Sequence, residues 1–379
     1  MTDYLDCNAT TPVDPRVQAE ILRYLEIEFG NPASPHDYGK RAKAAVQSAR
    51  DRIAAVVAAR RHEVFFTSGA TESNNLALLG LAPYGADIAK RHIVSTQIEH
   101  HAVLEPLAEL RRRGFQVTLV PPDRDGRVAA AAVVDAIRPD TLLVSMMHVN
   151  NETGVAQPVA ETADALVGQT AFFHVDAAQG FGKDIDALRH SRIDLISISG
   201  HKIYGPKGIG ALIARRRAAK RPPLQPLQFG GGQELGLRPG TLAVPLIAGL
   251  GAAAELALAE WPQRAERCRR IRERLLAALA RLSPVVHGSP RFTLPHVLNL
   301  SLPGVDSDDA IAALESVAAV SNGSACTSVC ATRSHVLAAM GVPPELIDSA
   351  LRLSWCHVTK LANLEAMIAV LRRLQQGSP

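Results

Sequence analysis

The sequence predicts an α/β protein with a mostly parallel sheet of about seven strands, helices on both faces of that sheet, and a smaller α+β domain. Between about residues 60 and 215, short β-branched or aromatic runs alternate with longer amphipathic runs, as in repeated strand–helix units. Several short runs are apolar throughout, which is typical of strands covered on both faces. Beyond residue 245, one long helical stretch precedes strands and helices in a less regular order.

The elements of the sheet follow in chain order. The expected strands are Glu63–Thr67, His92–Thr96, Gln116–Val120, Leu142–Met147, Phe172–Asp176, Leu195–Ser199 and Ile209–Ala214. Helical patterns lie between them, for example at Ala70–Leu81, His101–Arg113 and Val159–Val167. Strands that alternate with helices in this way pair in parallel, with the helices packed on both faces.

The second domain begins with the helical stretch from Pro245 to Leu282, which we expect to break near Trp261-Pro262. At the start of the chain, Leu5 to Thr11 is expected to be extended and Pro15 to Glu28 helical. This first segment has no strand partner of its own, so we expect it to pack on the later domain. We therefore predict a large domain of residues 15–255 and a closely apposed smaller domain of residues 1–14 and 256–379.

Composition excludes several classes of protein. The chain has 379 residues, with 41 Lys and Arg against 37 Asp and Glu, and the resulting net charge of +4 gives no case for a nucleic-acid-binding or membrane-binding surface. No apolar run approaches the ~20 residues of a membrane-spanning helix. The five cysteines are widely spread and follow no signal-like segment, so we expect reduced thiols in a cytoplasmic protein.

Polar residues follow the first expected strand, at the sheet edge where parallel sheets bind ligands. The segment Thr67–Asn75 combines Gly69, which allows a tight turn, with hydroxyl groups at a helix start. This pattern indicates an anion site for a phosphate, although for this segment taken alone ordinary helix capping is the better explanation of Ser and Thr. The run Gly205–Gly210 is not a P-loop, because no Lys-Ser/Thr pair follows its last glycine.

An acid and an amine follow two successive strands. Asp176 ends the fifth expected strand and Lys202 follows the sixth, so the two lie close together if these strands are neighbours. A salt bridge is the simplest interpretation of such a pair, but Lys202 lies among Ser, Gly and His at a strand end. An Asp for a pyridine nitrogen, a Lys for a Schiff base and hydroxyls for a phosphate are what pyridoxal phosphate requires. The sequence therefore predicts a pyridoxal phosphate site.

The chain resembles the class V aminotransferase-fold cysteine desulfurases from Leu5 through Arg352. The segments that carry the resemblance are Thr67–Glu72, Met147–Gly154, His174–Gln179, Ser199–Gly208 and Gly323–Ser328. The resemblance implies fold type I of the pyridoxal phosphate-dependent transferases, a homodimer, and conversion of L-cysteine to L-alanine. It further implies that the sulfur passes to Cys326 as a persulfide and then to an acceptor protein.

The same resemblance implies a role for individual residues. Lys202 would form the Schiff base, Asp176 would pair with the pyridinium nitrogen, and His100 would stack on the cofactor ring and assist proton transfer. Arg352 and Asn151 would bind the substrate carboxylate, for which the planar fork of an arginine suits bidentate binding. The other implied cofactor contacts are Ala70, Thr71, Ser199, His201, Gln179, Asn151 and, from the second subunit, Thr241.

Cys326 distinguishes a desulfurase from an aminotransferase, which needs no thiol. It lies between Gly323-Ser324-Ala325 and Thr327-Ser328, a small and polar stretch that offers nothing apolar to pack on. This environment suits a mobile nucleophile, which as thiolate attacks the sulfur of the bound cysteine.

The chain departs from the family pattern at several positions. Asn322 and Pro239 stand where serine is common. Cys330, Cys356 and His357 could with Cys326 suggest a metal or cluster site, but their spacing fits no standard pattern, and no metal is expected. Cys330 could instead resolve or accept the persulfide.

The acceptor pathway is open to several interpretations. The short tail after Arg352 predicts a dedicated acceptor, and Leu5–Pro12 resembles the desulfurases of DNA phosphorothioation systems. Iron–sulfur cluster assembly and tRNA thiolation are the other pathways considered. A selenocysteine lyase, another lyase or aminotransferase of this fold, and a non-catalytic scaffold partner are the alternative functions, the last disfavoured by the presence of Lys202, Asp176, His100 and Cys326.

Overall fold

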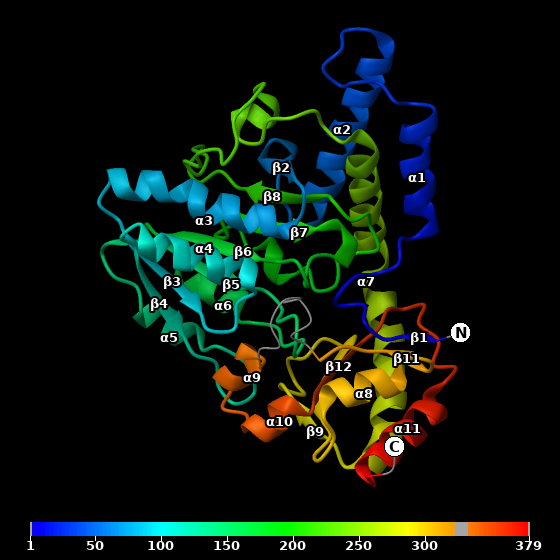
Figure 1. The fold of residues 1–379 in the computed structure, drawn as a ribbon. Coiled ribbons are helices and arrows are strands. Elements are labelled where there is room, and N and C mark those ends of the chain that lie inside the picture. Colours follow the sequence, from blue (N-terminus) through cyan, green and yellow to red (C-terminus); the bar gives the residue numbers. More distant parts are fainter. Residues whose placement is uncertain (1, 323–332, 378–379) are drawn as a thin grey trace.

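The computed structural model describes residues 2–322 and 333–377. Its main feature is a seven-stranded sheet in the order β2-β8-β7-β6-β5-β3-β4 (Figure 1). Strand β8 runs antiparallel to both of its neighbours, and all other neighbours pair in parallel. The strands are β2 (Val64–Thr67), β3 (His92–Thr96), β4 (Gln116–Val120), β5 (Thr141–Met147), β6 (Phe172–Asp176), β7 (Leu195–Ser199) and β8 (Gly210–Ala214). The predicted fold class is confirmed, and each expected strand is found to within one residue at either end.

Helices cover both faces of this sheet because its strands are apolar on both sides. Adjacent residues of a strand point to opposite faces, and in β3 both Ile93 and Val94 are fully buried, each in a different apolar cluster. Ile93 packs with residues of α3 and α4, and Val94 belongs to the cluster that contains residues of α2. The helices up to this sheet's last strand are α1 (Pro15–Glu26), α2 (Asp37–Val56), α3 (Ala70–Asp87), α4 (His101–Arg112), α5 (Ala130–Asp135) and α6 (Val159–Ala165).

Helix α7 (Val244–Leu279) connects the large sheet to the rest of the chain (Figure 1). The predicted break at Trp261-Pro262 is wrong, since the helix continues through Pro262. A proline inside a helix removes one N–H donor, and Pro262 lies on the exposed side of α7, while Ala257 and Arg264 on either side of it are buried. Packing on the buried side therefore keeps the helix continuous.

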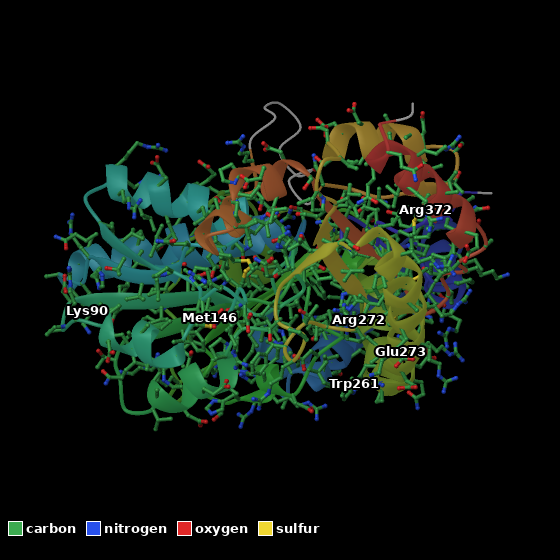
Figure 2. All side chains as sticks on the ribbon, turned by 90° about the horizontal axis from the view of Figure 1, so that it is seen from below. Lys90, Met146, Trp261, Arg272, Glu273 and Arg372 are labelled. Carbon is green, nitrogen blue, oxygen red and sulfur yellow. The ribbon has the colours of Figure 1, made fainter. Side chains whose placement is uncertain are left out.

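The apolar character of α7 comes from its role as a core helix. The stretch Val244–Leu282 has the length and hydropathy of a membrane-crossing helix, but 56% of its most apolar window is buried within the protein. Ala254 in its first half belongs to the core under the large sheet, and Leu275 in its second half belongs to a second core. Figure 2 shows Trp261, Arg272 and Glu273 along this helix, Met146 in the interior and Lys90 and Arg372 at the periphery.

The second core lies around a three-stranded antiparallel sheet in the order β12-β10-β9, with a two-stranded parallel sheet of β1 and β11 beside it. The strands are β1 (Asp3–Tyr4), β9 (Val285–His287), β10 (Val297–Ser301), β11 (Ala318–Ala319) and β12 (Ala350–Ser354). The helices are α8 (Ser307–Leu314), α9 (His335–Ala339), α10 (Pro344–Asp348) and α11 (Leu364–Gln375).

The start of the chain packs on this second part, as the sequence predicted. Strand β1 pairs with β11, and Asp6 forms a bridge with Ser354 at the end of β12. The regular strand covers only Asp3–Tyr4, because the following residues leave the small sheet for the edge of the large one. The predicted boundary after residue 255 falls inside α7, and the division into two domains stays a prediction.

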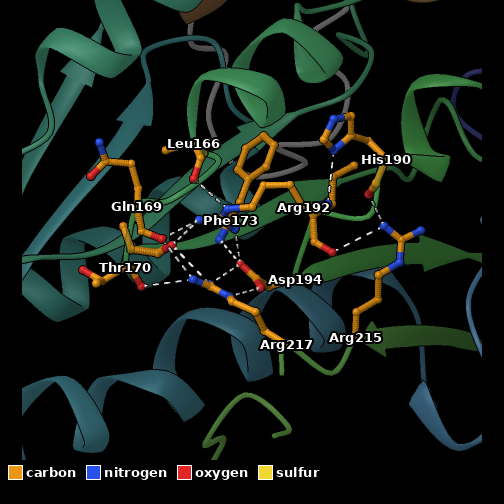
Figure 3. A network of polar contacts seen from close by, with 11 residues as sticks. Leu166, Gln169, Thr170, Phe173, His190, Arg192, Asp194, Arg215 and Arg217 are labelled. Atoms are coloured by element: carbon orange, nitrogen blue, oxygen red, sulfur yellow. Dashed lines mark hydrogen bonds and ion pairs between the residues drawn. The ribbon is translucent and has the colours of Figure 1, made fainter. Parts of the chain in front are cut away.

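A polar network fixes the amino end of β7 (Figure 3). Asp194, which is buried, accepts from the guanidinium groups of Arg192 and Arg217, each at 2.7 Å, and from the backbone N–H of Phe173 at 2.7 Å. Buried Arg215 donates to several backbone carbonyls nearby, including that of Leu188 at 2.8 Å. These contacts hold β6 and β7 in register at the end of the sheet opposite to their carboxyl termini.

His174 joins the three central strands in the middle of the sheet. Its Nδ1 lies 2.9 Å from Ser145 Oγ on β5, and its Nε2 lies 2.9 Å from Ser197 Oγ on β7. The side chain is fully buried, and this burial lowers the pKa of His174 to about 4. The imidazole is therefore neutral at physiological pH and acts as a hydrogen-bonded cross-link.

We expect the stability to fall as the pH decreases from about 6.5 to about 4. In this pH range His174 is protonated in the unfolded chain but not in the folded protein, so the unfolded state binds more protons. The free energy of unfolding therefore decreases as the pH falls. The shift corresponds to up to roughly 3 kcal/mol from this one residue. Urea unfolding of His174→Gln between pH 7 and pH 4 should give a flatter profile than the wild type.

His62→Gln is the matched control, because His62 is exposed and its substitution should leave the wild-type profile unchanged. A His174→Gln variant whose free energy of unfolding keeps the wild-type pH dependence would contradict the assignment.

Candidate active site

A cavity of about 560 Å³ lies at the carboxyl ends of β5, β6 and β7, where α3 and α4 begin. The N-terminal residues Asn8, Ala9 and Thr10 form one wall of it, and Arg352 of β12 reaches it from the smaller sheet. The cavity thus combines side chains from both parts of the protein. Its size and its few converging polar groups are typical of a small-molecule site.

Asp176 and Lys202 both line this cavity, as expected from their strands. Asp176 ends β6, Lys202 lies three residues after β7, and β6 and β7 are paired in parallel, so the prediction that the two residues lie close together is confirmed. Asp176 is 5% exposed, and its carboxylate accepts from Asn74 Nδ2 at 2.7 Å and from the backbone N–H of Ala178 at 2.9 Å. Both donors are neutral, so the negative charge of Asp176 is left to act on the cavity.

The amine of Lys202 is held by the N-terminal wall. Lys202 Nζ donates to the backbone carbonyls of Asn8 and, at 3.0 Å, of Ala9. Gln179 Nε2 donates to the same Asn8 carbonyl at 2.9 Å, and the backbone N–H of Asn8 donates to Ser354 Oγ at 2.9 Å. The first residues of the chain therefore position the amine and connect it to the end of β12.

One end of the cavity suits an anion. Helix α3 begins at Ala70, directly after Gly69, and Ala70, Thr71, Ser199 and His201 line the cavity there. Helix N-termini carry backbone N–H groups without helical partners and attract phosphate. Burial lowers the pKa of His201 to about 4, so its imidazole is a neutral hydrogen-bonding group near this helix end.

His100 lies at the start of α4 and faces the cavity. Its Nδ1 accepts a hydrogen bond from the backbone N–H of Ala102 at 3.0 Å, so the proton of the neutral ring is on Nε2. Burial lowers the pKa of His100, which favours this neutral form. Behind it, burial raises the pKa of Glu99 to about 8, so that carboxyl group is also neutral at pH 7.

Arg352 supplies the cationic group opposite Asp176. It is 1% exposed, and its guanidinium donates to Asp6 Oδ1 at 2.8 Å and to the backbone carbonyl of Asn151 at 3.1 Å. Asn151 also lines the cavity, and Asn8 Nδ2 donates to its carbonyl at 3.1 Å. These contacts fix the guanidinium, and its Nε has no hydrogen-bond partner within residues 2–322 and 333–377.

Unpaired buried atoms around the cavity fit a polar ligand such as pyridoxal phosphate. Oδ1 of Asn8, Oδ1 of Asn74, Oε1 of Gln179 and Nε of Arg352 are all buried without a hydrogen-bond partner among the described residues. Buried polar atoms of this kind are normally satisfied. A carboxylate for the pyridine nitrogen, an amine for the aldehyde and a helix N-terminus for the phosphate are present in one cavity, and so these residues fit the cofactor.

The structure brings most of the predicted site residues together. Those that line the cavity are Ala70, Thr71, His100, Asn151, Asp176, Gln179, Ser199, His201, Lys202 and Arg352. Thr241 is exposed and does not line it, and its contact with a second subunit stays a prediction. Cys326 and Cys330 lie outside the described residues.

The sequence analysis missed three contributors to the site. Asn74 lies one helical turn after Ala70 on α3, so its spacing could have placed it on the cavity side. The contacts of Asn8 depend on bringing the chain start to the large sheet, which no local pattern indicates. Nothing in the local sequence around Glu99 indicates that its carboxyl group is buried.

The fold and this site define a class of enzymes that bind pyridoxal phosphate at the carboxyl ends of a parallel sheet. The aminotransferase class-V family model matches residues 3–367, and the chain belongs to this family. Human cysteine desulfurase is 43% identical over 383 residues, which cover 99% of this chain and 83% of the human protein. The protein is accordingly a pyridoxal phosphate-dependent enzyme of the cysteine desulfurase group.

Solved structures agree with this assignment. A NifS-like protein superposes with a TM-score of 0.91 at 35% identity and covers 100% of both chains. DndA from Streptomyces lividans superposes with a TM-score of 0.82 at 50% identity and covers 92% of this chain and 98% of its own. The predicted family and fold are thus confirmed.

Proposed function

We propose that this enzyme converts L-cysteine to L-alanine and retains the sulfur as a persulfide on Cys326. The single observation that carries the proposal is the placement of Asp176 and Lys202 on neighbouring strand ends, in one cavity with Arg352. Asp176 supplies a negative charge, and Lys202 supplies an amine. Arg352 supplies a guanidinium group that can bind a carboxylate through two hydrogen bonds. An α-amino acid substrate needs all three groups.

The residues around the cavity would hold pyridoxal phosphate. Lys202 would bind its aldehyde carbon and Asp176 its ring nitrogen, while Gln179 would contact its ring oxygen and His100 its ring face. When bound, it supplies an electron sink for bonds at the substrate α-carbon. The other proposed cofactor contacts are Ala70, Thr71, Ser199, His201, Asn151 and, from the second subunit, Thr241.

The chain's own groups bind the substrate and move its protons. Arg352 and Asn151 bind the carboxylate of L-cysteine, and the contacts of Arg352 with Asp6 and the Asn151 carbonyl orient the guanidinium. Lys202 lines the same cavity, and its amine would take a proton from the substrate α-carbon and return it. The neutral ring of His100 can exchange a proton at Nε2 with the substrate thiol.

Cys326 takes the sulfur. Its thiolate attacks the substrate sulfur, a new S–S bond forms, the C–S bond breaks, and the electron pair of that bond remains on the substrate β-carbon, which is then protonated. L-cysteine and the Cys326 thiol thereby become L-alanine and a Cys326 persulfide, with no outside oxidant or reductant.

We further propose a cytoplasmic homodimer that passes this sulfur to an acceptor protein. Phe229 is 88% exposed and Leu235 is 69% exposed on the segment that leads to Thr241, and a second subunit would cover them there. The 50% identity to DndA supports a DNA phosphorothioation pathway, in keeping with the N-terminal resemblance.

Replacing Arg352 by lysine should raise the KM for L-cysteine roughly 10- to 100-fold, because a lysine keeps the charge and loses the bidentate fork. Steady-state alanine formation gives the KM, and the cofactor absorbance shows whether the site is otherwise intact. Arg138→Lys on the exposed surface is the control and should behave as the wild type. An unchanged KM for L-cysteine in Arg352→Lys would contradict the assignment of Arg352 as the residue that binds the substrate carboxylate.

Cys326→Ser should lower alanine formation by roughly 10²-fold or more, because the nucleophile is lost. Cys330→Ser is the matched control within the same stretch of sequence, and its first-turnover alanine should equal that of the wild type. Lower sulfide release in Cys330→Ser with normal alanine formation would assign Cys330 to onward transfer. Full activity of Cys326→Ser would instead favour a lyase of the same fold, such as a selenocysteine lyase.

A further inference from the structure

Two cysteines from opposite ends of the chain meet in the interior, outside the catalytic machinery. Cys7 directly precedes Asn8 of the cavity wall, and Cys356 follows β12 by two residues. The two side chains are 1% and 3% exposed, and with Tyr204 they form a small cluster separate from the main cores.

The backbone brings these two thiols together. The N–H of Cys7 donates to the carbonyl of Ser354 at 2.9 Å, and Asp6 is bridged to Ser354 in parallel. Cys7 lies in the turn that follows Asp6, and its side chain lies in one buried cluster with that of Cys356. The pairing of Asp6 with Ser354 thus places the two thiols in the same cluster, and such proximity is the first requirement for a disulfide.

The groups around the pair give the two thiols different pKa values. The hydrogen bond from Cys7, aided by Thr359 Oγ1 at 3.4 Å, lowers the pKa of Cys356 to about 6, and the same bond raises the pKa of Cys7. Lys183 is the nearby cation, and burial lowers its pKa to about 8, so it is still largely charged at pH 7. Cys356 is therefore the thiolate of the pair and the better nucleophile.

We propose that Cys7 and Cys356 form a dithiol–disulfide site that hydrogen peroxide oxidises and a dithiol reduces. The Cys356 thiolate attacks one peroxide oxygen, the O–O bond breaks, and hydroxide leaves, which gives a sulfenic acid on Cys356. The Cys7 sulfur then attacks the Cys356 sulfur, the S–O bond breaks, and water leaves. Two electrons pass from the two sulfurs to the peroxide, and the hydroxide takes up a solvent proton to give a second water molecule.

The third described cysteine with a buried side chain does not share this site. Cys268 lies on α7 within the apolar cluster of the smaller sheet, where its backbone carbonyl accepts from Trp355 Nε1 at 3.0 Å. Burial raises the pKa of Cys268 to about 12, so it stays a thiol. Cys268 therefore provides a matched control of similar burial.

The position of the pair connects it to the cavity. Cys7 is bonded to Asn8, whose carbonyl accepts from Lys202 and Gln179, while Cys356 follows the strand that carries Arg352. A disulfide would covalently join these two walls of the cavity. The inference concerns these two residues alone and holds whether or not Cys326 is the sulfur acceptor.

The test is a peptide map of the oxidised holoenzyme. The enzyme is treated with hydrogen peroxide, remaining thiols are alkylated, and a non-reducing digest is analysed by mass spectrometry. We expect a peptide that joins Cys7 to Cys356 with the loss of two hydrogens, and its disappearance after dithiothreitol. The Cys268→Ser variant should give the same linked peptide, and Cys7→Ser and Cys356→Ser should not.

Oxidation should also raise the melting temperature of the wild type and of Cys268→Ser by a few degrees, because the bond closes a very long loop. Alkylation of both Cys7 and Cys356 after peroxide treatment would overturn the proposal, as would linked peptides that join either one to another cysteine. The peptide map of the wild-type enzyme tests the Cys7–Cys356 disulfide even if a cysteine variant fails to fold.

Discussion

The site depends on the parallel pairing of β6 with β7. This pairing places the carboxyl end of one strand beside that of the other, and Asp176 and Lys202 face one cavity as a result. The network around Asp194 fixes the opposite end of these strands, and His174 joins them to β5 in the middle. The carboxylate of Asp176 and the amine of Lys202, which must contact the same small molecule, are thereby positioned by hydrogen-bonded strands of the central sheet.

The first residues of the chain place a second constraint on the geometry of the cavity. Asn8 and Ala9 hold the Lys202 amine through their carbonyls, while Asp6 holds the guanidinium of Arg352. Residues near the start of the chain therefore align groups from the large sheet and from β12. The same segment brings Cys7 to Cys356, so the geometry of the cavity and the chemistry of the cysteine pair rest on one connection.

Local patterns in the sequence predict the large sheet well because its strands are short apolar runs between amphipathic helices. They place Asp176 and Lys202 at the ends of two successive strands, and the pairing of β6 with β7, which local patterns leave open, makes the two residues neighbours. Helix α7 was wrongly expected to break, because burial on both sides of Pro262 outweighs the local preference of proline. Asn8 and the Cys7–Cys356 contact arise from pairing between distant segments, which periodicity cannot indicate. Thr241 depends on a second subunit and Cys326 on residues outside those described.

The most direct test of the central claim is to locate the amine that binds the cofactor. Borohydride reduction of the purified holoenzyme, followed by peptide mapping, identifies the lysine that carries the reduced pyridoxyl group. The account predicts that Lys202 alone carries it. Labelling of Lys207, which also lines the cavity, or of half-buried Lys183 in place of Lys202 would contradict the assignment of Asp176 and Lys202 as the pair that binds the cofactor.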